Sequence, residues 1–133
     1  MQAAVRGAVQ VSENGRVAIW DASARLVGEI MKINSIREED IVSIVFSLTE
    51  DLTKGNPAAG LRRMGFADVP LFCLQEARMV GGMPRVIRVL LSFEAPHRGW
   101  WKRLARRRPV PVYLDGAVKL RPDLDQGGAP SGY

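Results

Sequence analysis

Three polar residues occupy positions from which they could take part in chemistry. Arg88 lies within an apolar run, Cys73 lies within a second run, and Glu76 closely follows that second run. Each also has a simpler interpretation. An arginine on a strand is more often an ion-pair partner than a catalyst, a carboxylate after a strand is usually solvated, and a cysteine in an apolar strand is usually a small core residue. The residue types alone therefore leave the function open.

The strand that would carry Arg88 has the clearest pattern in the chain. Residues 85–94 alternate between two sets of side chains, with Ile87, Val89, Leu91 and Phe93 in one set and Val86, Arg88, Leu90 and Ser92 in the other. Because successive side chains of a strand point to opposite faces, the first set forms a continuous apolar face. We therefore expect Arg88 to project from the opposite face of a rigid element.

Two helices are expected before this strand. Residues 16–33 should form the first, because apolar residues recur there at spacings of three and four, which places them on one face. These residues are Val17, Trp20, Ala24, Val27 and Met31. Asn56 followed by Pro57 is a favourable helix start, and this second helix should end near Gly65.

Three more strands are expected, over residues 5–11, 41–48 and 69–74. Gly7 in the first of them would allow a close backbone approach. The apolar run at 41–48 is typical of a strand that is buried on both faces. Ser35 followed by Glu38 has the form of a capping box, which predicts a short helical turn there.

The last part of the chain should contain a hairpin and a tail. Asp115-Gly116 is a strong turn signal between two short apolar segments, residues 112–114 and 117–120. Residues 126–133 have the composition of a flexible tail. Because strands and helices mix without strict alternation, the expected fold is α+β, in a single domain over residues 1–125 with a mixed sheet packed by helices.

Composition narrows the class of protein. The 133 residues are enough for one domain with one core, and 47% hydrophobic with 25% charged residues is typical of a globular protein. No apolar run approaches the ~20 residues of a membrane helix, and the first residues do not have the pattern of a signal peptide. One cysteine and one histidine, Cys73 and His97, exclude an internal disulfide and a metal site rich in these ligands. We expect a cytoplasmic protein without a metal or cofactor.

The net charge of +5 comes from one segment. Of the 19 basic residues, six lie between Arg98 and Arg108, and the remaining 13 are balanced by 14 acidic residues. The basic character is therefore no argument that the folded body binds nucleic acid. Residues 98–109 also contain Trp100 and Trp101, so this basic loop could bind nucleic acid, an anionic membrane surface or a partner protein, or it could be a solvated extension.

Four ordered segments resemble one known family. They are VRGA at 5–8; TEDL at 49–52 with the following residues to Arg62; VPLFCLQE at 69–76 with GG at 81–82 and RVIRV at 85–89; and VYL at 112–114 with LRPDL at 120–124. Together they span roughly residues 4–125. They resemble the small trimeric chorismate mutases, the class that forms a pseudo-α/β-barrel homotrimer and not the all-helical class.

The resemblance implies the conversion of chorismate to prephenate by a pericyclic Claisen rearrangement. Such a reaction needs no proton transfer and no covalent intermediate, so positioning and electrostatics are sufficient. By this match Arg88 lies at the ether oxygen, where negative charge builds in the transition state. Glu76 accepts a hydrogen bond from the ring hydroxyl, and Cys73 lies beside the same group.

The remaining matched residues would bind the substrate. Arg6 matches a residue that holds a substrate carboxylate, with Tyr113 assisting. Arg62 matches an arginine that the neighbouring subunit supplies at the mouth of the site. Leu120 and Arg121 match a C-terminal segment that closes over the ligand. The resemblance thus implies sites at the subunit interfaces of a homotrimer, with chorismate and prephenate as the small-molecule partners and no membrane partner.

Simpler roles for these residues stay open. Arg88 and Glu76 could pair only with each other, and Cys73 could belong to the core. Tyr113 could contribute only its backbone, and Arg121 could serve only to order the tail.

Two positions depart from the family and leave other functions open. Asn56 replaces a usual phenylalanine, and Ala59 replaces a frequent lysine, at the entrance of the site in relatives. The chain could therefore be a chorismate-binding relative with weak or altered activity. A binding protein that acts through residues 98–108 is the alternative from a different class, although nucleic acid is not the expected partner.

Overall fold

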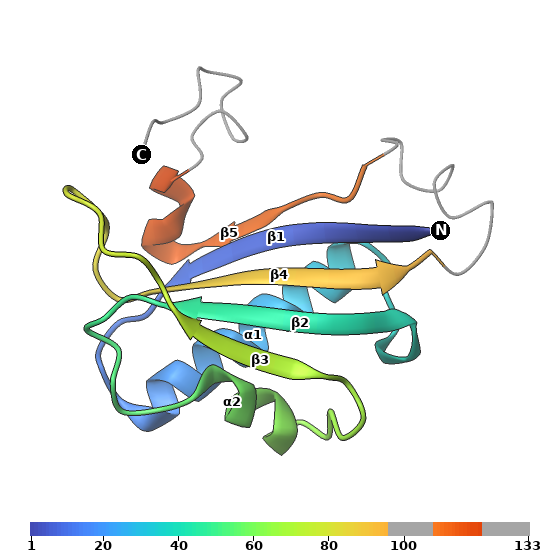
Figure 1. Ribbon diagram of the computed structural model, residues 1–133, viewed down its shortest axis with the longest axis horizontal. Helices are drawn as coiled ribbons and strands as arrows, with labels where there is room; N and C mark the ends of the chain where they lie inside the picture. Colours follow the sequence, from blue (N-terminus) through green and yellow to red (C-terminus); the bar gives the residue numbers. More distant parts are fainter. Residues whose placement is uncertain (96–107, 121–133) are drawn as a thin grey trace.

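The computed structural model describes residues 1–95 and 108–120 (Figure 1). Within these ranges the chain forms one sheet of five strands in the order β3-β2-β4-β1-β5, with two α-helices and two short 3-10 helices. In chain order the elements are β1 (Gln2–Gln10), α1 (Arg16–Ile33), η1 (Glu38–Asp40), β2 (Ile41–Leu48), α2 (Pro57–Arg63), β3 (Leu71–Gln75), β4 (Val86–Glu94), β5 (Val112–Leu114) and η2 (Asp115–Leu120).

The sheet is mixed. β4 lies in the middle and pairs antiparallel with both β1 and β2. The two outer strands pair in parallel, β3 with β2 and β5 with β1. One mixed sheet with helices and a shared core confirms the predicted α+β class and the single domain.

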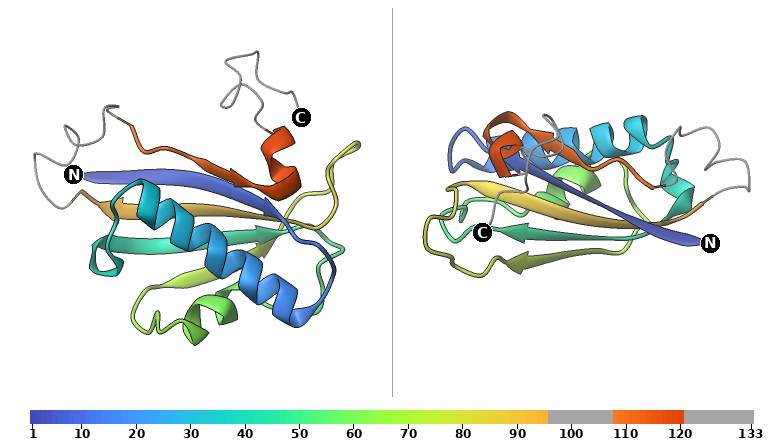
Figure 2. Two further views of the ribbon diagram at one scale, coloured as in Figure 1. Left: turned by 180° about the vertical axis from the view of Figure 1, so that it is seen from behind. Right: turned by 90° about the horizontal axis from the view of Figure 1, so that it is seen from above.

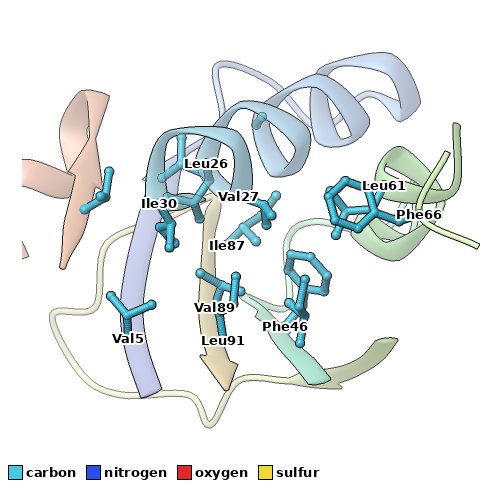
Figure 3. Close-up of a cluster of buried hydrophobic side chains, with 14 of the residues drawn as sticks. Val5, Leu26, Val27, Ile30, Phe46, Leu61, Phe66, Ile87, Val89 and Leu91 are labelled. Atoms are coloured by element: carbon cyan, nitrogen blue, oxygen red, sulfur yellow. The ribbon is translucent and has the colours of Figure 1, made fainter. Parts of the chain in front are cut away.

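The core lies between the sheet and the two α-helices. Figure 2 shows that α1 and α2 cover the same face of the sheet, and neither lies over the other face. In Figure 3, Ile87, Val89 and Leu91 of β4 point toward Leu26 and Ile30 of α1, and all five are buried. The alternation predicted for β4 is therefore confirmed, because its apolar set faces the helices.

α1 has the predicted bounds but buries a different stripe of residues. Its buried residues are Ile19, Ala22, Ser23, Leu26, Val27 and Ile30. Of the predicted stripe only Val27 is buried, and Val17 is 61% exposed. The helix has apolar residues on both stripes, so the approach of neighbouring elements decides which one is covered. No helix in the described part of the chain is long and apolar enough to cross a membrane.

Two glycines permit the close approach that selects this stripe. A Cβ atom on Gly7 of β1 would lie 2.8 Å from the Ile30 side chain and 2.9 Å from the Val112 carbonyl oxygen. A Cβ atom on Gly60 of α2 would lie 2.5 Å from the Trp20 carbonyl oxygen. Neither contact is tolerable for a larger residue, so both positions need glycine for packing. The role predicted for Gly7 is confirmed.

The predicted hairpin at Asp115-Gly116 is wrong. β5 pairs in parallel with β1, and residues after it form η2, not a second strand. Asp115 adopts a positive φ of 55°, and its carboxylate is paired with Arg25 of α1. The chain therefore turns toward α1, and η2 buries Ala117 against Ala8 and Val86.

The capping box predicted at Ser35 and Glu38 is also wrong. Ser35 has a positive φ of 53°, which is a helix-ending conformation and not the extended one that an N-cap needs. η1 begins after Arg37, whose backbone N–H donates to the Asp40 carboxylate. The Asp40 contact also raises the pKa of the Arg37 guanidinium.

β2 differs from its prediction, whereas α2 agrees with it. β2 is buried on one face only, through residues such as Ile44 and Phe46, and Val42 is 39% exposed. α1 and α2 cover a single face of the sheet, and among the described residues no helix lies over the other face of β2. At α2, Asn56 is the predicted N-cap, because its side chain accepts a hydrogen bond from the Ala58 backbone N–H. The departure at Asn56 thus has a structural role.

Candidate active site

The face of the sheet that α1 and α2 do not cover carries Arg88. By strand register Arg88 lies between Ser47 of β2 and Ala8 of β1. Leu74 of β3 and Tyr113 of β5 continue the same row on the outer strands. Because residues paired across a sheet point to the same face, all five side chains share the face opposite the core.

A pocket with a volume of about 1000 Å³ lies at one end of the sheet. It is lined by Arg6 of β1, Arg88 of β4, Glu76 just after β3, the turn at residues 49–51 and the loop at residues 77–84. Figure 1 shows this loop extending beyond the sheet at the end where η2 lies. A smaller pocket of about 580 Å³ contains none of the predicted site residues. The larger pocket is therefore the candidate active site.

Arg88 and Glu76 form an ion pair in this pocket. The Arg88 Nε atom lies 2.5 Å from Glu76 Oε1, and their side chains are 25% and 21% exposed. The Ser47 hydroxyl donates to the same Glu76 oxygen at 3.1 Å. The Glu76 backbone N–H donates to the Leu48 carbonyl, which extends the pairing of β3 by one residue. Glu76 is thus anchored by both its backbone and its side chain.

Arg6 differs from Arg88 in its partners. It lines the same pocket and is exposed. Within residues 1–95 and 108–120, no carboxylate lies within ion-pair distance of its guanidinium. The pocket therefore combines a paired arginine with an arginine whose charge is available to an anionic ligand.

A hydrogen-bond network fixes the pocket wall at the start of β4. The Thr49 hydroxyl accepts from the Val86 backbone N–H and donates to Asp51. Both carboxylate oxygens of Asp51 accept from the Arg85 backbone N–H, at 3.2 and 3.0 Å. Arg85 has a positive φ of 53°, so this network holds a strained residue three positions before Arg88.

Sequence reasoning missed this network and the contact of Ser47 with Glu76. Thr49 and Asp51 belong to the matched segment at residues 49–52 but received no predicted role, and neither did Ser47. The available signals were the Thr-x-Asp spacing, typical of a side chain that caps neighbouring backbone, and the place of Ser47 on a strand. Neither signal identifies a partner that lies 29 to 37 residues away along the chain.

Tyr113 and Leu120 lie near the pocket without lining it. Tyr113 pairs with Ala8 and is half-buried, and Leu120 ends η2. Both pack against a small cluster that contains Ala8 and Val86. Arg121 and residues 98–107 of the basic loop lie outside the described residues.

Arg62 and Cys73 are not brought to the pocket within one chain. Arg62 lies in the last turn of α2, and its Nη1 donates to the carbonyls of Phe66 and Ala67, at 2.7 and 3.0 Å. Cys73 is opposite the buried Phe46 in the β2–β3 pairing and packs against the core. Burial raises the pKa of the Cys73 thiol, because the thiolate would lose hydration. Their roles in substrate binding stay predictions.

The described residues do not provide an evident metal site. Within residues 1–95 and 108–120, no three histidine, cysteine, aspartate or glutamate side chains gather closely enough to hold a metal ion. In the pocket, each nearby carboxylate has another partner. Glu50 pairs with Arg78, Asp51 binds the backbone of Arg85, and Glu76 pairs with Arg88.

The family model for chorismate mutase type I matches residues 2–124. The chain belongs to this family. The match covers nearly the whole chain, including every described element from β1 to η2. A chorismate mutase type I is an isomerase, so the predicted family and the predicted class of enzyme are confirmed.

Individual chorismate mutases are similar over almost the same length. Chorismate mutase AroH of Thermus thermophilus is 38% identical over 122 residues, which cover 91% of this chain and 94% of that protein. Chorismate mutase AroH of Bacillus subtilis is 31% identical over 121 residues, 90% of each chain. A solved structure of a chorismate mutase from Clostridium thermocellum has a TM-score of 0.77 and 32% identity, and covers 88% of this chain and 98% of that one.

Proposed function

We propose that this chorismate mutase rearranges chorismate to prephenate in the pocket of Arg6, Glu76 and Arg88. The observation that carries the proposal is the ion pair of Arg88 and Glu76 inside a pocket that also contains the exposed Arg6. Chorismate is a dianion with a ring hydroxyl, so it requires cations for its carboxylates and an acceptor for its hydroxyl. The pocket offers both kinds of group.

The chemistry follows from where these groups lie. The rearrangement breaks an ether C–O bond while a C–C bond forms, and no proton moves. As the C–O bond stretches, the ether oxygen gains negative charge, and the Arg88 guanidinium stabilises that charge. Glu76 holds the ring hydroxyl, and Arg6 holds a carboxylate, so the substrate is kept in the reactive, folded geometry. No residue is required as a nucleophile or general base.

The proposal includes a homotrimer of the pseudo-α/β-barrel type. It is supported by exposed apolar side chains on the face of the sheet that α1 and α2 do not cover. On this face Phe72 is 62%, Leu74 48% and Leu90 44% exposed. The register of β2, β3 and β4 places these side chains on the face of Arg88. An apolar sheet face beside a polar pocket is the kind of surface that a second copy covers. A neighbouring copy would supply Arg62, with Tyr113, Leu120 and Arg121 completing the site.

The proposed enzyme acts in the cytoplasm and uses no metal or cofactor. A direct assay tests the reaction. Purified protein is mixed with chorismate in buffer with a chelator, and the loss of chorismate's ultraviolet absorbance is followed while the product is identified by chromatography. We expect prephenate at a rate proportional to enzyme concentration. No turnover, a different product or inhibition by the chelator would contradict the proposal.

A further inference from the structure

Building on the chorismate mutase chemistry proposed above, we propose that Ser47 is a positioning residue that aims the Glu76 carboxylate at the substrate hydroxyl. Ser47 lies on β2, and its hydroxyl donates to Glu76 Oε1 at 3.1 Å. Arg88 Nε lies 2.5 Å from the same oxygen. Ser47 therefore acts on the substrate through Glu76 and not by direct contact.

The backbone makes this arrangement rigid. Ser47 lies directly opposite Arg88 in the antiparallel pairing of β2 and β4, and opposite Leu74 in the parallel pairing of β2 and β3. Glu76 follows β3 two residues after Leu74, with its N–H bonded to the Leu48 carbonyl. Three adjacent strands thus contribute one polar group each, with Ser47 on the middle strand of the three.

Two contacts on one oxygen determine which carboxylate oxygen can serve a ligand. The Ser47 hydroxyl donates a hydrogen bond to Oε1 and Arg88 Nε forms an ion pair with the same oxygen, whereas in the described part of the chain no hydrogen bond reaches Oε2. A single contact would leave the carboxylate free to rotate about its terminal torsion, which has a broad energy profile. A hydrogen bond from one strand and an ion pair from another restrict that rotation and leave Oε2 for the ring hydroxyl.

The hydrogen bond from Ser47 also matters for Arg88. Without Ser47, the guanidinium would be the only side chain in the described residues that orients Glu76, so the pair could shift together when substrate enters. With Ser47 in place, Glu76 keeps its orientation while the Arg88 guanidinium faces the ether oxygen. A misplaced reacting group costs rate more than affinity, so we expect the effect of Ser47 on kcat to exceed its effect on KM.

The test compares three single variants by kcat and KM for chorismate. Ser47→Ala should lower kcat about tenfold with KM changed by less than about threefold. Ser47→Thr retains the hydroxyl on a β-branched side chain that strands accept, and should restore most of the kcat. Ser43→Ala is the matched control, because Ser43 lies four residues earlier on the same face of β2. It should leave kcat within about twofold.

A double variant separates positioning from a general structural effect. If Ser47 acts through Glu76, then Ser47→Ala should cost little in a Glu76→Ala background, because there is no carboxylate left to orient. An equal loss in both backgrounds would overturn the proposal. So would a Ser47→Ala enzyme as active as Ser43→Ala, or a Ser47→Thr enzyme as poor as Ser47→Ala with an unchanged melting temperature.

The same experiment distinguishes this proposal from the proposed function. Wild-type turnover and its loss in Glu76→Ala test the reaction and the role of Glu76. If both are observed and Ser47→Ala is still fully active, only the role of Ser47 is overturned. If the wild type does not convert chorismate, both the proposed function and the proposed role of Ser47 are overturned.

Discussion

The residue on which the proposed chemistry depends most is Arg88. Its side chain is three-quarters buried, and Glu76 pairs with it at 2.5 Å. Pairing alone is the simpler interpretation of such a geometry, and it predicts a loss of stability when either partner is removed. Catalysis predicts something different, because the ether oxygen is negatively charged only in the transition state. The two interpretations are therefore separated by kinetics, not by structure.

We predict that Arg88→Gln lowers kcat at least ~100-fold, the loss typical of one oxyanion donor. KM should change much less, because the lost contact belongs mainly to the transition state. Arg88→Lys should recover part of the rate, since the charge returns without the planar fork. The measurement is kcat and KM of each variant, together with its melting temperature. As a control, Arg37→Gln removes an exposed arginine that pairs with Glu39 and Asp40 and does not line the pocket, and it should leave kcat within about twofold.

A folded Arg88→Gln enzyme with kcat within about tenfold of wild type would contradict the electrostatic mechanism. A large loss of stability without a loss of kcat would support the pairing interpretation. Either result would move the assignment of the catalytic charge away from Arg88.

Cys73 should behave as a partly buried thiol and not as a nucleophile. Burial raises its pKa above the ~8.5 of a free thiol, so at pH 7 the side chain stays protonated. The folded state favours the protonated thiol. This contribution to the free energy of unfolding is fully present below the thiol's pKa in the unfolded chain and is lost as pH rises through its pKa in the folded protein. We predict that iodoacetamide modifies the native protein more slowly at pH 8 than it modifies the unfolded chain.

Cys73→Ser should also keep most of the activity, because the pericyclic step needs no nucleophile. Rates of alkylation between pH 7 and 10, native and in denaturant, give the direct comparison. Native alkylation as fast as that of the unfolded chain would contradict the buried thiol. Complete inactivation of a well-folded Cys73→Ser protein would reopen covalent catalysis.

At the scale of elements, Asn34 joins the end of α1 to the start of β5. It is fully buried, and its amide donates to the Ile30 and Val110 carbonyls at 2.9 Å each. Its oxygen accepts from the Val110 backbone N–H at 2.6 Å. β5 has only three residues, so this clamp is a main determinant of where Tyr113 lies.

We predict that Asn34→Ala lowers the free energy of unfolding by about 2–3 kcal/mol, because backbone groups at Val110 lose their partners in a partly buried place. Urea denaturation measures the change. Asn14→Ala is the matched control. Asn14 also makes three hydrogen bonds, to Thr53 and Lys54, but at exposed groups that water can satisfy. Asn14→Ala should therefore lower the free energy of unfolding by about 1 kcal/mol or less. Equal losses in the two variants would contradict the buried clamp.

At the scale of the whole molecule, the proposed site needs two chains. Arg6 lines the pocket, whereas Arg62 of the same chain binds the carbonyls of Phe66 and Ala67, away from the pocket. We predict that Arg6→Ala and Arg62→Ala are each poor enzymes. When the two variants are refolded together, about a quarter of the interfaces in random trimers hold both arginines, so activity should recover toward that fraction.

The measurement is activity before and after mixed refolding, with mass spectrometry to show that the trimers contain both variants. Each variant refolded alone is the control and should stay poor. No recovery in trimers of proven mixed composition would contradict the contribution of Arg62 from a neighbouring chain.

Most of the secondary structure was predictable from local patterns. The alternation over β4 identified a buried face and placed Arg88 on the other, and Asn56-Pro57 marked the start of α2. These features depend on residues a few positions apart, so the sequence alone determines them. The family, and with it the class of enzyme, was also predictable, because four matched segments keep their order along the chain.

The wrong predictions concern features that depend on contacts between residues far apart in the sequence. α1 contains two apolar stripes, and only the close approach of Gly7 and Gly60 selects the one that is buried. Asp115-Gly116 has the composition of a hairpin turn, but the ion pair with Arg25, 90 residues away, directs the chain into η2. The tertiary structure likewise decided that Ser47 meets Glu76 and that Cys73 faces the core. Local patterns specify which backbone conformation forms, whereas contacts between distant segments decide which face each side chain meets.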